Sequence, residues 1–76
     1  MKIFLKKHES NAGYWVYEGY KKAWQDLGYD CYFYNNLEEL KNEENFYVMA
    51  IDADVKSDRE LKILKKSIKA FLFVSP

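Results

Sequence analysis

The sequence predicts a small α/β fold with three layers, in which helices alternate with about four strands of a parallel sheet. Short apolar runs typical of buried strands alternate with amphipathic stretches typical of helices along the whole chain. The connections between them are short, which favours βαβ crossovers and a parallel sheet. With 76 residues there is room for one core and no second domain, so we expect residues 1–76 to form a single unit.

The N-terminal third contains the first strand and the first helix. Ile3–Lys6 reads as a brief strand, and a polar loop is expected from Lys7 to about Gly13. A helix is expected over residues 14–27, because five apolar residues there recur with the 3.6-residue period of one buried face: Val16, Tyr20, Ala23, Trp24 and Leu27. Gly28 follows at a position where a left-handed C-terminal cap is common.

The middle of the chain predicts two strands separated by a short helix. In residues 30–34, successive side chains alternate between two faces of different composition. This period of two is typical of a strand whose two faces differ in burial, and here it indicates a strand at the edge of the sheet. Asn36, followed three residues later by Glu39, resembles a capping box and predicts a short helix from Leu37 to about Asn42. Phe46–Ile51 is continuously apolar and uncharged, as expected for a parallel strand covered on both faces.

The last third predicts one more helix and one more strand. Ser57 and Glu60 repeat the capping spacing, and the helix that follows carries an apolar stripe formed by Leu61, Leu64 and Ile68. Residues 70–74 are again wholly apolar and predict a fourth strand. A further helix would normally follow such a strand, so the sequence suggests a fold cut in half.

Composition and charge exclude several classes of protein. The apolar fraction of 49% indicates a globular rather than a disordered chain. Cys31 is the only cysteine, which excludes an internal disulfide or a thiolate metal site and favours a reducing, cytoplasmic location. The first apolar run is too short for a signal peptide or a membrane span. Twelve basic residues balance twelve acidic ones, which argues against a general nucleic-acid-binding protein.

The charges are unevenly distributed along the chain. Residues 1–55 carry six basic and ten acidic side chains, whereas residues 56–76 carry six basic and two acidic ones. The basic third helix could face a nucleic acid or an acidic partner. Its lysines surround an apolar stripe without interleaved aromatic residues, so we interpret them as a solvated outer face.

The candidate ligand-binding residues follow the predicted strands. In open parallel sheets, ligands bind beyond the carboxyl ends of the strands, near the point where the strand order reverses. By this rule the candidates are Lys7, His8, Asn11 and Gly13 after the first strand, Asn35 after the second, Asp52 and Asp54 after the third and Ser75 after the fourth. Tyr14 is expected near the same edge, and we take His8, Asn11, Gly13, Tyr14 and Asp52 as the ligand-binding residues. A helix N-terminus after the first loop would favour an anion. Neither the three-glycine dinucleotide fingerprint nor the P-loop is present, however.

Individual candidates allow a functional and a plainer interpretation. His8, the only histidine, could act as a general base or be a solvated loop residue. Tyr14 could stack on a sugar or base, or simply pack on the sheet. Asp52 and Asp54 could hold Mg²⁺, but they match known aspartate motifs poorly, and we interpret them as polar residues after a strand. We therefore assign no catalytic residue, metal site or cofactor.

Residues 2–28 resemble the beginning of GT-B-type glycosyltransferases. The matching features are the strand M-K-I-F-L, the loop ending in Ala12-Gly13-Tyr14, the helix with Tyr17-Glu18-Gly19-Tyr20 and the closing Leu27-Gly28-Tyr29-Asp30. The resemblance implies the first half of a Rossmann-like domain on the acceptor side of the enzyme, with a sugar or nucleotide sugar as ligand. The donor-binding residues of the family have no counterpart, so this segment is expected to be inactive alone.

Two alternatives to a glycosyltransferase-like segment stay open. The first is a small non-catalytic module that binds a protein through its last strand or its basic third helix, and the second is a metal-dependent phosphatase-like domain. The last predicted strand lacks the charges that normally protect an exposed sheet edge. A homodimer, or binding of a partner chain through this strand, is therefore expected.

Overall fold

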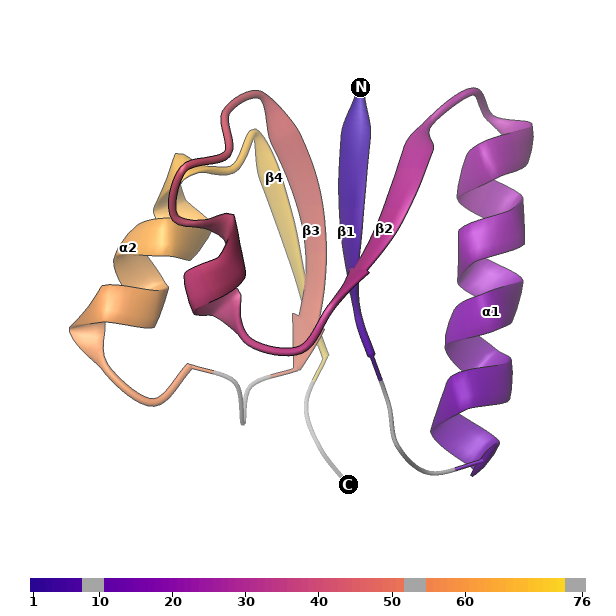
Figure 1. Cartoon of the computed structure of the whole chain (residues 1–76), viewed down its shortest axis with the longest axis horizontal. Coiled ribbons are helices and arrows are strands. Elements are labelled where there is room, and N and C mark those ends of the chain that lie inside the picture. The colour runs from indigo at the N-terminus through magenta and orange to yellow at the C-terminus, as the bar shows by residue number, and fades with distance from the viewer. Residues whose placement is uncertain (8–10, 52–54, 74–76) are drawn as a thin grey trace.

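The computed structural model describes residues 1–7, 11–51 and 55–73 and confirms the α/β fold class (Figure 1). Four strands form one sheet: β1 (Lys2–Lys6), β2 (Asp30–Tyr34), β3 (Phe46–Ile51) and β4 (Lys69–Phe73). The helices are α1 (Asn11–Asp26), the 3₁₀ helix η1 (Leu37–Leu40) and α2 (Asp58–Lys66). The predicted strands therefore lie within about one residue of the observed ones. Val74, which the predicted fourth strand included, lies outside the described residues.

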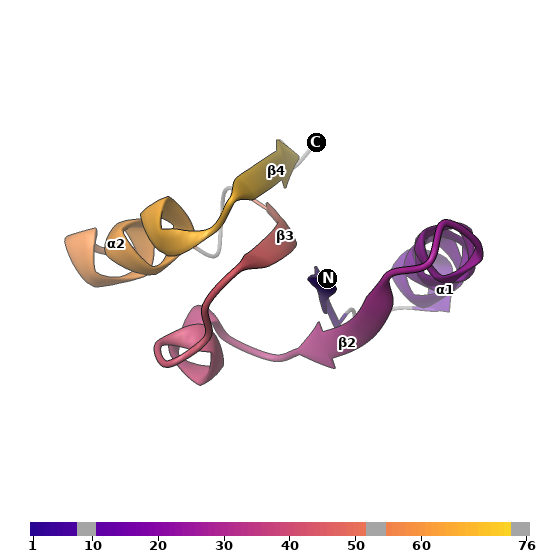
Figure 2. The same ribbon diagram turned by 90° about the horizontal axis from the view of Figure 1, so that it is seen from above.

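All strand pairings in the sheet are parallel, and the strand order is β2-β1-β3-β4. Strand β2 is an edge strand, as its alternating pattern predicted. Helix α1 lies on one face of the sheet, whereas α2 and η1 lie on the other (Figure 2). The structure therefore has the three layers expected from the alternation of strands and helices.

The core consists of one apolar cluster on each face of the sheet. On the α1 face, Ile3, Leu5 and Met49 pack against Tyr17. The other face has a larger cluster, whose members are Phe4, Tyr34, Leu37, Leu40, Phe46, Val48, Ala50, Ile63 and Leu64. Strand β1 contributes to both clusters because successive side chains point to opposite faces of a strand.

Helix α1 begins at Asn11, three residues earlier than the sequence predicted. Gly13 therefore lies inside the first turn of the helix and not in a preceding loop. One glycine costs a helix about 1 kcal/mol relative to alanine, which is too little to stop it. The predicted C-terminal cap is confirmed, because Gly28 has a φ angle of 93° and its N–H donates to the carbonyl oxygen of Gln25 at 2.9 Å.

The predicted buried face of α1 was wrong in part. Of the predicted face only Trp24 is even half-buried, whereas Val16, Tyr20, Ala23 and Leu27 are exposed. The buried residue of the helix is Tyr17, which was not predicted. The helix packs mainly over β1 and β2, whereas Tyr17 reaches Met49 of β3 and Trp24 contacts Tyr47 of β3 and Phe71 of β4. Val16, Tyr20 and Leu27 lie on the flank of the helix beyond this narrow contact, so the sheet does not cover them.

The predicted stripe on α2 was also only partly right. Leu64 is buried as expected, but its buried neighbour is Ile63 and not Leu61, which is 38% exposed. The helix ends at Lys66, so Ile68 lies in the connection to β4, where its N–H donates to the carbonyl oxygen of Phe46. Ile68 therefore lies outside the helix, and the 3.6-residue helical period does not determine which way it faces.

Candidate functional site

The strand order reverses at β1, which has β2 on one side and β3 on the other. Leu5 of β1 is in register with Met49 of β3, so the carboxyl ends of these two strands are adjacent. Ligands of open parallel sheets bind at such a reversal. The carboxyl ends of β1 and β3 therefore lie side by side at the sheet edge where the sequence predicts a site.

The predicted site residues can be placed only in part. His8 and Asp52 lie outside the described residues. Asn11, Gly13 and Tyr14 form the first turn of α1, and the structure describes their backbone but not their side chains. Whether these five residues come together as a site stays a prediction.

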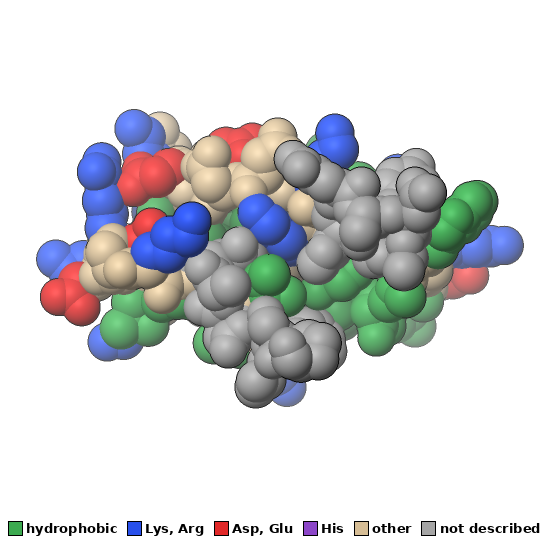
Figure 3. All heavy atoms as spheres, turned by 90° about the horizontal axis from the view of Figure 1, so that it is seen from below, with side chains coloured by type: hydrophobic (Ala, Val, Ile, Leu, Met, Phe, Trp, Pro, Cys, Tyr) green, Lys and Arg blue, Asp and Glu red, His purple; other side chains and the backbone are tan. Residues whose placement is uncertain are grey.

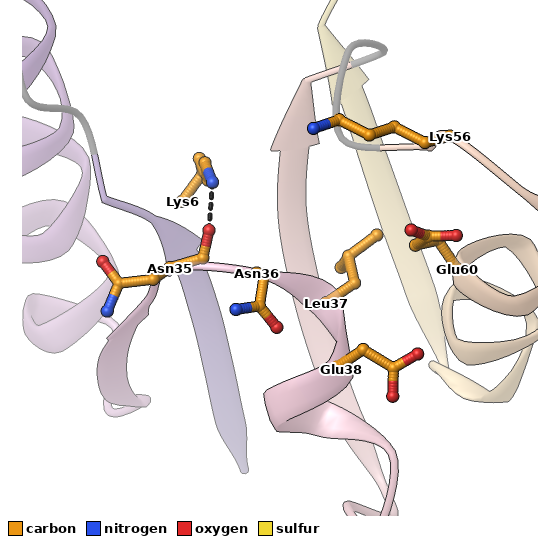
Figure 4. A pocket seen from close by; sticks show the side chains of 7 residues that line it. All are labelled: Lys6, Asn35, Asn36, Leu37, Glu38, Lys56 and Glu60. Carbon is orange, nitrogen blue, oxygen red and sulfur yellow. Dashed lines mark hydrogen bonds between the residues drawn. The ribbon is translucent and has the colours of Figure 1, made fainter.

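A polar pocket of about 150 Å³ opens at the carboxyl edge of the sheet, on the face covered by α2 and η1. Its walls come from the end of β1, from the residues between β2 and η1, and from the beginning of α2 (Figure 4). The lining residues are Lys6, Asn35, Asn36, Leu37, Glu38, Lys56 and Glu60. Asn35 is thus the one candidate from the strand ends that the structure shows in a pocket.

The two carboxylates of the pocket are already engaged by other side chains. Glu38 Oε1 lies 2.7 Å from Nε of Arg59, and Glu60 accepts a hydrogen bond from the Ser57 hydroxyl. The Lys6 ammonium donates to the backbone carbonyl oxygen of Asn35 and lies 5.8 Å from the centre of the Tyr34 ring. The Lys56 side chain extends across the carboxyl end of β3 (Figure 4).

The rim of the pocket is fixed by a side-chain cap on η1. Glu39 Oε2 accepts hydrogen bonds from the backbone N–H groups of Asn35 and Asn36, at 2.7 and 2.8 Å. These bonds belong to the capping box that the Asn36–Glu39 spacing predicted, which is confirmed. It holds the connection after β2 in place, and with it the Asn35 carbonyl that binds Lys6.

The pKa of Glu60 is lowered, chiefly by the hydrogen bond from Ser57 and in small part by the nearby Lys56 ammonium. Because the pKa of this carboxyl is lower in the folded state, its ionised form stabilises the folded state at pH values above the unfolded-state pKa. This stabilisation is lost as the pH falls through the folded-state pKa. We expect Ser57→Ala to raise the pKa of Glu60 toward 4.5, its ordinary value. Titration of the carboxyl carbon by NMR checks this result, and Ser67→Ala, a change beyond the other end of α2, should leave it unchanged.

Neither a metal site nor a reactive thiol appears in the described part of the chain. Within residues 1–7, 11–51 and 55–73, no group of three His, Cys, Asp or Glu side chains could hold a metal ion. Burial raises the pKa of the Cys31 thiol, an effect that the nearby Lys21 ammonium only partly offsets. The thiol therefore stays protonated near neutral pH and is a poor nucleophile.

Sequence reasoning missed Lys6, Lys56 and Glu60 as pocket residues. The sequence pattern indicates only the end of a strand at Lys6 and only part of a helix cap at Glu60. One signal was available: Lys6 ends the first strand and Lys56 precedes the third helix, so both belong to the carboxyl edge of a parallel sheet. Figure 3 looks onto this edge and shows lysine or arginine side chains near its middle.

Comparison with known proteins gave no match for this chain. No protein-family model matches the sequence, and no curated protein or solved structure is significantly similar to it. In the described part of the structure, no helix is both long and apolar enough to cross a membrane.

Proposed function

We propose that the chain is an N-terminal, acceptor-side Rossmann segment of a glycosyltransferase-like protein, and that its carboxyl edge binds a sugar or nucleotide sugar. The observation that carries this proposal is the pocket between Lys6 and Lys56, which lies at the edge where the strand order reverses. The resemblance of residues 2–28 to GT-B-type enzymes supports the choice of ligand class.

The composition of the pocket suits an anionic sugar ligand. The Arg59 guanidinium offsets the charge of Glu38, so this carboxylate opposes an incoming anion less than an unpaired one would. Glu60 keeps its charge, because its hydrogen-bond partner Ser57 is neutral. The ammonium groups of Lys6 and Lys56 can bind phosphate oxygens. The amides of Asn35 and Asn36 can donate to and accept from sugar hydroxyls, and Leu37 supplies an apolar surface for the ring.

Replacing Lys56 with glutamine should weaken binding of a nucleoside diphosphate sugar about threefold to fivefold, because an exposed charge pair contributes up to about 1 kcal/mol. The measurement is an amide NMR titration. We expect the first shifts at Asn35, Asn36 and Lys56, together with His8, Asn11, Gly13 and Asp52. Lys62→Gln is the matched control, because Lys62 is an exposed lysine of α2 that does not line the pocket.

Two results would contradict the proposal. One is a spectrum that millimolar nucleotide sugar and simple glycans leave unchanged, and the other is an equal loss of affinity in the Lys56 and Lys62 variants. Addition of Mg²⁺ addresses the phosphatase-like alternative separately. We expect the amides of Asp52 and Asp54 not to move, and specific shifts there would favour a metal-dependent enzyme.

A further inference from the structure

Strand β4 has an open edge. It pairs with β3 on one side, and no other strand of the described chain pairs with its outer side. Its sequence is K-A-F-L-F, so Lys69 at the first position is its only charge. Natural edge strands are usually protected by charges, proline or a bulge. The outer backbone groups of β4 are therefore available to another strand.

Exposed apolar side chains lie on the α2 face of this edge. Leu72 of β4 is 50% exposed, and Ile68, just before the strand, is 53% exposed. Leu61 of α2 adds to them, because it lies on the side of the helix turned away from η1. Arg59 forms an ion pair with Glu38 of η1 and so marks the side of α2 that faces η1. Leu61 comes two residues later, which is a rotation of about 200° around the helix axis, so it lies on the opposite side. We call Leu61, Ile68 and Leu72 the edge patch.

The opposite face of the edge is aromatic. The Phe71 ring lies 5.9 Å from the Trp24 ring and 6.5 Å from the Tyr47 ring, measured between centres. Phe71 remains half-buried despite these contacts. A strand added to β4 would therefore meet apolar side chains on both faces of the sheet.

We propose that β4 pairs with β4 of a second copy of this chain, antiparallel across a two-fold axis at Phe71. This register lets the five residues of both strands overlap fully. Ala70 then lies opposite Leu72 of the partner subunit, and Lys69 lies opposite Phe73 of the partner subunit. Within the two paired strands no like charges lie opposite each other, because Lys69 is the only charged residue of β4.

A second copy is the partner that this surface fits. A two-fold interface brings the same patch from each subunit together. Each edge patch would therefore meet an identical apolar patch beside the paired strands, and both open edges would be paired at once. The result is a continuous eight-stranded sheet with α2 of each subunit next to the seam.

The first test is the sedimentation of the intact chain at micromolar concentrations. We expect a dimer, and Leu72→Lys should weaken it by at least about tenfold, because a buried leucine is replaced in both subunits. Val16→Lys is the matched control: Val16 is 53% exposed, much like Leu72, but lies on α1. A folded monomer at all concentrations, or equal weakening by both changes, overturns the proposal.

A second test checks the register by cross-linking. In a Cys31→Ser background, Ala70→Cys and Leu72→Cys proteins are prepared separately and then mixed under mild oxidation. Directly opposed residues of antiparallel strands have Cα atoms about 4.5–5.5 Å apart, within disulfide range. We expect disulfides between the two different variants to dominate. In the proposed register, position 70 lies opposite position 72 of the partner subunit, whereas either position is displaced by two residues along the strand from the same position in the partner subunit. The register would be contradicted if either variant alone formed disulfide-linked dimers in the same yield as the mixture of the two variants.

Discussion

Phe46→Ala should lower the free energy of unfolding by about 3–5 kcal/mol, the usual cost of removing a fully buried phenylalanine. Phe46 is completely buried and packs edge-on against Phe4, with ring centres 5.6 Å apart. Domains are stable by only about 5–15 kcal/mol, and a chain of this length belongs near the lower end of that range. The variant should therefore be largely unfolded or close to it. Urea denaturation followed by circular dichroism measures the effect.

Tyr32→Ala is the control for this change. Tyr32 also packs against Phe4, with ring centres 5.7 Å apart, but 48% of it is exposed. Its removal leaves no closed cavity, so the loss should be clearly smaller than for Phe46. Both variants should be compared at one protein concentration, because association would add to the apparent stability. Equal losses would show that the cluster around Phe46 is not the core.

Trp24→Ala should destabilise the protein by about 3 kcal/mol, the lower end of the range for such a change because the ring is only half-buried. Trp24 connects α1 to β3, to β4 and to the turn that precedes β2. Its ring lies edge-on to Tyr29 at 4.9 Å and also contacts Tyr47 and Phe71. Its Nε1–H donates to the Met49 sulfur at 3.3 Å. Without it, α1 keeps Tyr17 as its one buried side chain among those described.

Trp15→Ala is the matched control because it changes the same residue type in the same helix. Trp15 is 72% exposed, so its replacement should alter the free energy of unfolding by no more than about 0.5 kcal/mol. Denaturation curves of the two variants give the comparison directly. If Trp15→Ala were as costly as Trp24→Ala, the orientation of α1 described above would be wrong.

The strands were predictable from the sequence because each is a short apolar run with little or no charge inside it. Phe46–Ile51 was identified to the residue, since a strand covered on both faces tolerates no polar side chain. The buried face of α1 was not predictable in the same way. Apolar residues cover more than one side of this helix, and both the stripe through Tyr20 and the one through Tyr17 fit a helical period. The position of the helix over β1 and β2 decides between them.

The pocket was less accessible to sequence reasoning than the fold. Its lining comes from segments that are far apart in the chain, and it depends on the end of β1 lying near the beginning of α2. Lysine is so common on protein surfaces that Lys6 and Lys56 gave no signal by themselves. Asn35 could be predicted because it directly follows a strand, and the rule for open parallel sheets places such residues near ligands.

The central position of β1 has a consequence for how the chain folds. Lys2 pairs with Phe46 across 44 residues, so this contact requires a long loop to close. During synthesis β1 leaves the ribosome before the other three strands, yet it cannot gain β3 as its second neighbour until β2 and η1 have followed. Until then the apolar side chains of Ile3, Phe4 and Leu5 lack their contacts with β3. We therefore expect productive folding to be late and cooperative, with chaperone capture of β1 as its main competitor.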